Sequence, residues 1–191
     1  MPIDFTDVEL AAAVAATPKP KAGPSRHLSF VEMGCYNHLR DRNNQPVVFE
    51  GVQPGGLIAP YPPIWYAFRL SPLSIEFEAV RQLCCDDLGR DARIDINSSY
   101  RTATYNRAIK GAPLSQHAEG RALDLVPPKG MSLDRFFELC LLRAKTPGSK
   151  IRGLARYFVG RFVHLDVRPT DVLVMWNNST RPALTPPDVD G

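Results

Sequence analysis

Two short segments, far apart in the sequence, constrain the fold of this chain more than any other feature. The first, Ser115–Asp124, is a polar loop that contains His117 and runs into an apolar stretch. The second, Phe162–Asp166, alternates in polarity and places His164 and Asp166 on one face of a predicted strand. Two adjacent strands, with the loop ahead of one of them, would bring these polar side chains to one point. The sequence therefore predicts that the two segments pair.

His117, Asp124 and His164 are the predicted ligands of a metal ion. Zinc prefers imidazole nitrogen and carboxylate oxygen in a tetrahedral arrangement, and a catalytic site keeps three protein ligands so that water takes the fourth position. Asp124 lies in Arg121–Val126, which we expect to form a buried strand because its apolar residues precede a proline pair. Gly120 suits a point where the backbone bends. The pattern indicates a catalytic zinc site.

The motifs in these segments resemble those of the M15 zinc peptidases, specifically the M15A and murein endopeptidase branch. The pattern Ser-x-His-x-x-Gly-x-Ala-x-Asp is followed by Phe-Val-His-x-Asp in the expected order. Ser98–Arg107 is similar to the family's Ser-Gly-Tyr-Arg-Ser-x-x-Tyr-Asn segment, Gly153–Tyr157 resembles its lead into the second histidine, and Trp176 matches a tryptophan that often follows. The resemblance runs from about His27 to Trp176. It implies that the substrate is a peptide of bacterial peptidoglycan.

The resemblance also implies a role for Arg101, because the arginine of this segment faces the active site in the family. A guanidinium group can hold a peptide carboxylate or a developing oxyanion through paired hydrogen bonds. The alternative is a salt bridge that fixes the loop near Asp124. Ser115 is a candidate substrate contact, although it suits orientation of the loop or of His117 better than a nucleophilic role, since no serine–histidine–acid arrangement is apparent.

The general base is where the chain departs from part of the family. Several M15 peptidases carry an acid three residues before the second histidine, where this chain has Arg161. Asp166 is the nearest acid, and it would either accept the proton of zinc-bound water or orient His164. If Asp166 is not the base, the insertion over residues 41–63 offers Glu50.

Two functions follow from these residues. The first is a zinc-dependent peptidase that hydrolyses the stem peptide or cross-link of peptidoglycan, as an endopeptidase or a D,D-carboxypeptidase, and serves as a phage lytic or virion-associated enzyme. The second is a weakly active or inactive structural or wall-binding protein of a phage particle, because fold resemblance alone does not establish chemistry. The arginine at the family's acid position leaves room for this second function.

The predicted fold is α+β, a small and mainly antiparallel sheet with helices packed on one face and the zinc site on the open face. This hedgehog- or DD-peptidase-like architecture comes from the resemblance. Residues 1–25 are expected to be an N-terminal segment with a proline-rich linker, 26–176 the peptidase domain, and 177–191 an extended or disordered tail. Expected elements are helices over Leu28–Leu39, Pro72–Leu88, Thr102–Lys110 and Ser132–Lys145, a strand over Arg93–Asn97 and a hairpin within Pro46–Val52.

Net charge, cysteine content and the absence of expected targeting segments limit the partners and the cellular location that we expect. The net charge of +3 is small and the basic residues are interleaved with acids, so nucleic acid is not an expected partner. Four cysteines are too few to form a disulfide framework in a chain of this length. Cys84 and Cys140 fall on apolar faces of predicted helices, so we expect them to be thiols in the core. We expect neither a signal peptide nor a membrane span. The protein would then stay cytoplasmic until lysis, or travel in a phage particle with virion or lysis partners, and act at the cell wall.

Overall fold

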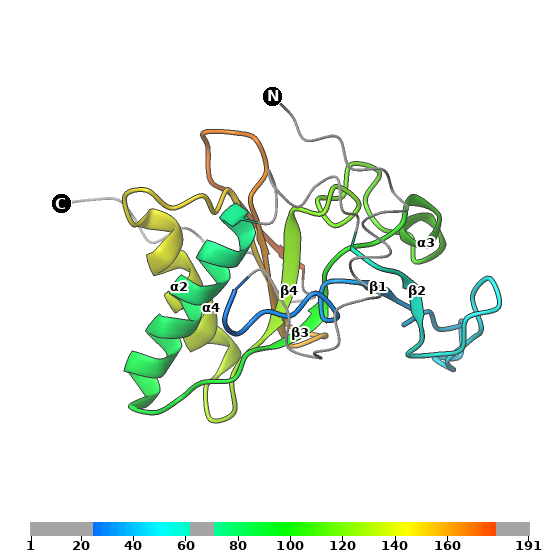
Figure 1. Ribbon diagram of the computed structural model, residues 1–191, viewed down its shortest axis with the longest axis horizontal. Coiled ribbons are helices and arrows are strands. Elements are labelled where there is room, and N and C mark those ends of the chain that lie inside the picture. Colours follow the sequence, from blue (N-terminus) through cyan, green and yellow to red (C-terminus); the bar gives the residue numbers. More distant parts are fainter. Residues whose placement is uncertain (1–24, 62–70, 179–191) are drawn as a thin grey trace.

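The computed structural model describes residues 25–61 and 71–178 of the chain. The fold is α+β, as predicted: a five-stranded mixed sheet carries two packed helices on one side, and a two-stranded antiparallel sheet lies at the opposite end of the molecule (Figure 1). The elements are β1 (Cys35–Tyr36), β2 (Leu57–Ala59), α2 (Ser71–Leu88), β3 (Asp95–Ser98), α3 (Ala103–Ala108), β4 (Ala122–Val126), α4 (Leu133–Lys145), β5 (Gly153–Tyr157), β6 (Phe162–Asp166) and β7 (Val174–Asn178).

The large sheet has the strand order β3-β4-β6-β5-β7, and every neighbouring pair is antiparallel except β5 and β7. The two segments singled out in the sequence form β4 and β6, which pair directly. In this register Asp124 lies opposite His164. On the other side of β6, Ala155 of β5 lies opposite His164 and Gly153 lies opposite Asp166. The predicted pairing of the two segments is therefore confirmed.

Local signals explain where the helices begin and end. Ser132 caps α4 by accepting a hydrogen bond from the backbone N–H of Arg135, and Thr102 caps α3 in the same way. Gly89, with a φ of 63°, follows the last residue of α2. The predicted helices over α2 and α4 are confirmed to within a residue. Helix α3 is shorter than predicted because Lys110 adopts a left-handed conformation, with a φ of 56°.

The core lies between the helices and one face of the sheet. Alternation along β4 and β6 sends Leu123 and Leu165 into it, so that the polar residues next to them lie on the other face. Cys84 and Cys140 are buried in this core as free thiols, as expected, and burial raises the pKa of Cys84 to about 12. The site and the core thus occupy opposite faces of the same two strands.

The N-terminal part of the described chain differs from the prediction. The expected helix over Leu28–Leu39 is wrong, because the segment forms a turn and then strand β1. The pairing of β1 with β2 takes the place of the helix, and the backbone at Gly34 packs closely against β2, since a Cβ there would lie 2.7 Å from the Leu57 side chain. The hairpin predicted within Pro46–Val52 is present as a tight turn, with Phe49 paired to Val52.

Several predictions concern the ends of the chain. Residues 1–24, with most of the proline-rich linker, and residues 179–191 lie outside the described part, and the domain boundaries remain predictions. Asn177 and Asn178, placed in the tail from the sequence, belong to β7. Among the described residues, no helix has both the length and the apolar character that crossing a bilayer requires.

A buried carboxylate joins the two large helices to the strand that follows them. Glu76 of α2 is fully buried, and its oxygens accept hydrogen bonds from the Arg143 guanidinium at 2.8 and 3.2 Å. The Ser149 hydroxyl and the backbone N–H of Lys150 donate to the same carboxylate at 3.2 and 2.6 Å. Glu76 therefore fixes α4 and the approach to β5 relative to α2.

We expect Glu76→Ala to lower the free energy of unfolding by about 3 kcal/mol, since it leaves the Arg143 cation and two further donors without their acceptor. Asp86→Ala, on the exposed face of the same helix, is the matched control and should change stability by less than about 0.5 kcal/mol. Urea unfolding of both variants measures the difference. Equal midpoints for the two would contradict the structural role of Glu76.

Candidate metal centre

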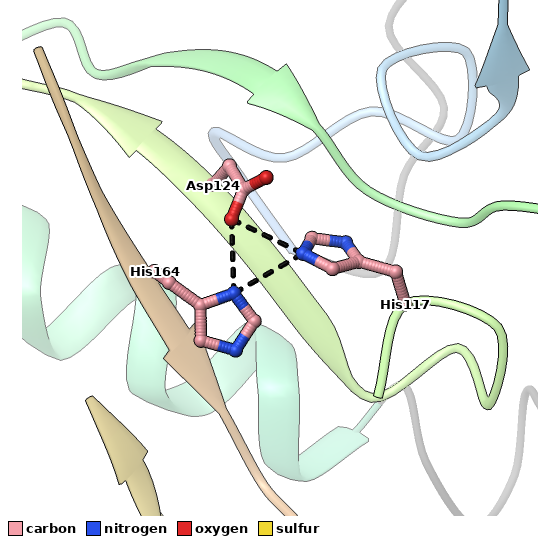
Figure 2. A group of neighbouring side chains, drawn as sticks. All are labelled: His117, Asp124 and His164. Atoms are coloured by element: carbon pink, nitrogen blue, oxygen red, sulfur yellow. Dashed lines mark hydrogen bonds and ion pairs between the residues drawn. The ribbon is translucent and has the colours of Figure 1, made fainter. Parts of the chain in front are cut away.

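Three side chains from separate parts of the chain converge on one point. His117 lies on the loop before β4, Asp124 on β4 and His164 on β6 (Figure 2). The His117 Nε2 atom is 3.1 Å from both Asp124 Oδ1 and His164 Nδ1, and His164 Nδ1 is 2.9 Å from Asp124 Oδ1. The residues are only 3, 2 and 6% exposed. Within the described part of the chain, they are the one group of three or more potential metal ligands.

The loop before β4 is shaped to present His117. The Ser115 hydroxyl accepts a hydrogen bond from the backbone N–H of His117 at 3.3 Å, and the His117 carbonyl accepts from the backbone N–H groups of Gly120 and Arg101. Gly120 has a φ of 63°, a conformation that glycine adopts without the steric cost of a Cβ. Tyr61 donates its hydroxyl hydrogen to the Gly120 carbonyl. The bend predicted at Gly120 is therefore present.

Hydrogen bonds on the outer side of each imidazole fix which nitrogen faces the cluster. The His117 Nδ1 atom lies 2.6 Å from the Ser99 carbonyl oxygen, which can only accept, so Nδ1 carries the hydrogen. His164 Nε2 lies 3.0 Å from Asp166 Oδ2, which accepts in the same way. In the neutral rings, His117 Nε2 and His164 Nδ1 then offer lone pairs toward Asp124. Two imidazole lone pairs and a carboxylate oxygen form a donor set that fits a metal ion.

Burial and mutual contacts shift the pKa values of all three side chains. Burial would raise the pKa of Asp124, but the neighbouring His117 and His164 outweigh it and hold that pKa well below its usual range. Burial lowers the pKa of His117. Burial also acts to lower the pKa of His164, yet the hydrogen bonds to Asp124 and Asp166 raise it overall. The centre therefore keeps an ionised carboxylate between two imidazoles in a buried place.

Arg101 lies between the cluster and a cavity. Its Nη2 donates to Asp124 Oδ2 at 2.8 Å and its Nε donates to the Ser98 hydroxyl at 3.0 Å. Asp124 Oδ1, the oxygen that faces the imidazoles, is not used by this ion pair. The salt bridge weighed in the sequence analysis is thus present. Arg101 also lines a cavity of about 250 Å³, together with Tyr36, His38, Ser98, Tyr100 and Tyr105.

Asp166 is completely buried, and its carboxylate is held from several sides. Arg168 donates from Nε to Oδ1 at 2.8 Å and from Nη2 to Oδ2 at 2.5 Å, and its backbone N–H donates to Oδ1 at 3.1 Å. With the bond from His164 Nε2, these donors fill the roughly four acceptor positions of a carboxylate. Burial opposes ionisation, but Arg168 and His164 lower the pKa of Asp166 to about 2.

The sequence analysis did not single out Arg168. The signal that could have found it is the alternation along β6, because Arg168 continues the face of His164 and Asp166 by two more residues.

Two other residues weighed in the sequence analysis, the arginine at the family's acid position and the alternative acid, lie at turns. Arg161, at the position where several family members carry an acid, is exposed at the start of β6 with a φ of 52°. Glu50 is exposed in the turn between Phe49 and Val52, with a φ of 47°. Neither belongs to the group of potential ligands.

Comparison with protein families gives a match over the part of the chain that contains this site. The family model described as Peptidase M15 matches residues 71–166, which is about half of the 191-residue chain. The match begins with α2, ends with β6 and contains all three candidate ligands. No curated protein matches the chain.

We expect His117→Ala, Asp124→Ala and His164→Ala each to abolish stoichiometric metal binding, because each removes one of three protein ligands. His27→Ala is the control, since this exposed histidine pairs with Glu78 and lies outside the cluster. Metal content after zinc loading and gel filtration gives the result. Stoichiometric metal in all three ligand variants would show that the ion binds elsewhere.

Proposed function

The chain belongs to the Peptidase M15 family, and from this we propose that it is a zinc-dependent peptidase that hydrolyses peptide bonds in bacterial peptidoglycan. The observation that carries the proposal is the convergence of His117 Nε2, Asp124 Oδ1 and His164 Nδ1 within 3.1 Å of one another. Three protein ligands leave a fourth position for water or substrate, which is typical of catalytic rather than structural zinc sites.

Zinc suits this donor set better than harder cations do. Magnesium and calcium favour oxygen ligands, whereas zinc binds imidazole nitrogen and carboxylate oxygen. Tetrahedral zinc with bonds of about 2.0–2.1 Å places its ligand atoms roughly 3.3 Å apart. The separations of 2.9–3.1 Å are close to this value. When bound, zinc would activate water and polarise the scissile carbonyl.

The surrounding residues would keep the ligands in place. Asp166 accepts a hydrogen bond from the outer N–H of His164 and three more from Arg168, so no acceptor position is left for a proton from water. This supports a role in orienting His164 over that of general base. Ser115 uses its hydroxyl on the backbone of His117, and this supports its assignment to the loop rather than to chemistry. Arg101 directs Asp124 by occupying Oδ2.

The cavity beside Arg101 is our proposed place for the peptide. It adjoins the centre through Arg101 and Ser98, and its tyrosine side chains offer flat apolar surfaces with polar tips. The Arg101 guanidinium in its lining suits a peptide carboxylate or the oxyanion that develops during hydrolysis. The stem peptide and the cross-link of peptidoglycan both carry such groups. The phage lytic or virion-associated role expected from the sequence remains a prediction.

One observation favours the second candidate, a wall-binding protein with little activity. Arg161 occupies the position of the family's acid, and Asp166 is already fully hydrogen-bonded. General-base catalysis usually contributes a factor of about 10²–10⁴, so a site without it would retain metal and substrate but turn over slowly.

The two candidates give different results on purified peptidoglycan. The zinc-loaded peptidase should release fragments with new amino and carboxyl groups, lose this activity with chelator and regain it when zinc is restored. Mass spectrometry of the products identifies the bond and separates endopeptidase from carboxypeptidase. His117→Ala is the inactive control. Zinc-loaded protein that sediments with peptidoglycan and releases no peptide would overturn the peptidase and support the wall-binding alternative.

We expect Arg101→Ala to lower kcat/KM about 10²-fold or more while the protein stays folded. A contact to the oxyanion would reduce kcat, whereas a contact to a ground-state carboxylate would mainly raise KM. Arg107→Ala, an exposed arginine on α3, is the control for loss of one positive charge. Metal content is measured in parallel because Arg101 also contacts Asp124. Unchanged kcat/KM, or a loss fully explained by lost metal, would remove Arg101 from substrate binding.

A further inference from the structure

Behind His164 lies a layer of side chains that contact the imidazole or its support but are not candidate ligands. Asp166 accepts a hydrogen bond from the outer nitrogen of the imidazole, Nε2. Arg168 donates two parallel hydrogen bonds to the Asp166 carboxylate. The Trp176 ring packs against the His164 ring, with centroids 5.2 Å apart, and the Arg168 guanidinium lies 5.2 Å from the centroid of the same indole. Trp176 is fixed in turn by its Nε1–H, which donates to the Tyr157 hydroxyl at 3.2 Å. Arg168 therefore contacts both groups that touch the outer side of His164.

Gly153 provides the space that this arrangement needs. It lies opposite Asp166 in the pairing of β5 with β6. A Cβ at Gly153 would lie 2.0 Å from Asp166 Oδ2 and 2.4 Å from Cγ, distances at which the atoms collide. The backbone of Gly153 is in a regular strand conformation that any residue can adopt, so the requirement for glycine comes from the carboxylate and not from the backbone.

We propose that Arg168 and Gly153 are positioning residues that set the metal affinity of the centre through Asp166. Arg168 orients the carboxylate, Gly153 leaves room for it, and Asp166 fixes the ring and tautomer of His164. This inference rests on the proposed metal centre but not on the identity of the substrate. It assigns to two residues outside the ligand set a measurable share of metal binding.

The chemistry of the contacts explains why these two residue types are needed. Outer hydrogen bonds to ligating histidines fix the ring and increase its basicity, and removing such partners typically lowers metal affinity about 10–100-fold. The planar guanidinium engages both oxygens of Asp166 at once, which a lysine ammonium cannot do in the same geometry. Arg168 also neutralises a carboxylate that is completely buried.

The first test replaces Arg168 and compares it with a neighbouring cation. Arg152 lines the same surface cavity as Arg168, but among the described residues its side chain donates to the carbonyls of Ser149 and Ile151 and not to Asp166. We expect Arg168→Gln to weaken zinc binding about 10–100-fold, Arg168→Lys to weaken it about 10-fold, and Arg152→Gln to leave it within about twofold. Competition with a chromogenic chelator gives the zinc affinity. The visible spectrum of the cobalt-substituted protein should change for the Arg168 variants alone, and thermal unfolding checks their folding.

The second test displaces the Asp166 carboxylate while Arg168 stays unchanged. Gly153→Ala should weaken zinc binding about as much as Asp166→Ala, because the added methyl displaces the carboxylate. In the Asp166→Ala background the methyl has room, so Gly153→Ala should cause no further loss, and Arg168→Gln should likewise add nothing. Additive losses would show that these residues act independently of Asp166 and would overturn the inference.

The outcomes separate this inference from the proposed function. If the wild-type protein binds zinc tightly and cleaves no peptide, the proposed function fails. The effects of the Arg168 and Gly153 variants on zinc affinity can still be measured in that case. If it cleaves peptidoglycan and the variants bind zinc as the wild type does, the inference fails alone. If the wild-type protein binds no zinc, both are wrong.

Discussion

The register between β4 and β6 is the constraint on which the site depends. It places Asp124 directly opposite His164, at the short distance that lets an imidazole and a carboxylate meet. A slip of β6 by one residue would turn His164 to the face of the sheet opposite Asp124 and Leu165 away from the core. That face is filled by Leu123, Leu165 and the helices, so a slip would bury charge in the core and expose leucine. Apolar packing on one face thus fixes the polar geometry on the other.

The loop histidine depends on this register less directly. His117 is positioned by the Ser99 carbonyl, by the hydroxyl of Ser115 and by the left-handed turn at Gly120, all of which act on the loop itself. The Ser99 carbonyl belongs to the segment that follows β3, and β3 pairs with β4 on the side away from β6. Three adjacent strands and the loops next to β3 and β4 therefore carry the three candidate ligands and the groups that position His117. A centre built in this way needs little rearrangement to accept an ion, which reduces the entropic cost of binding.

Sequence patterns predicted the parts of the structure that depend on local chemistry. Alternation along β6 placed His164 and Asp166 on one face, and the serine cap located the start of α4. Patterns failed where pairing with distant residues decides the conformation. The helix expected over Leu28–Leu39 is replaced by β1, which exists because β2 pairs with it, and β7 was not predicted because its parallel partner β5 lies some twenty residues earlier. The local sequence of β1 and β7 does not identify these partners, whereas the polar motifs of the segments that form β4 and β6 indicated their pairing.

The roles of Arg101 and Arg168 were the hardest to predict, because an arginine in a sequence does not reveal which atoms it contacts. In the structure each pairs with a buried aspartate, but with a different number of donors. Arg101 gives one hydrogen bond to Asp124 and leaves Oδ1 turned toward both imidazoles. Arg168 gives three to Asp166, counting its backbone N–H, and the fourth comes from His164. Two carboxylates on neighbouring strands therefore differ in the one property that a metal ligand requires, an unused oxygen lone pair directed at the ion. In the proposed metal centre, the arginine contacts would therefore leave Asp124 available as a ligand and confine Asp166 to supporting one.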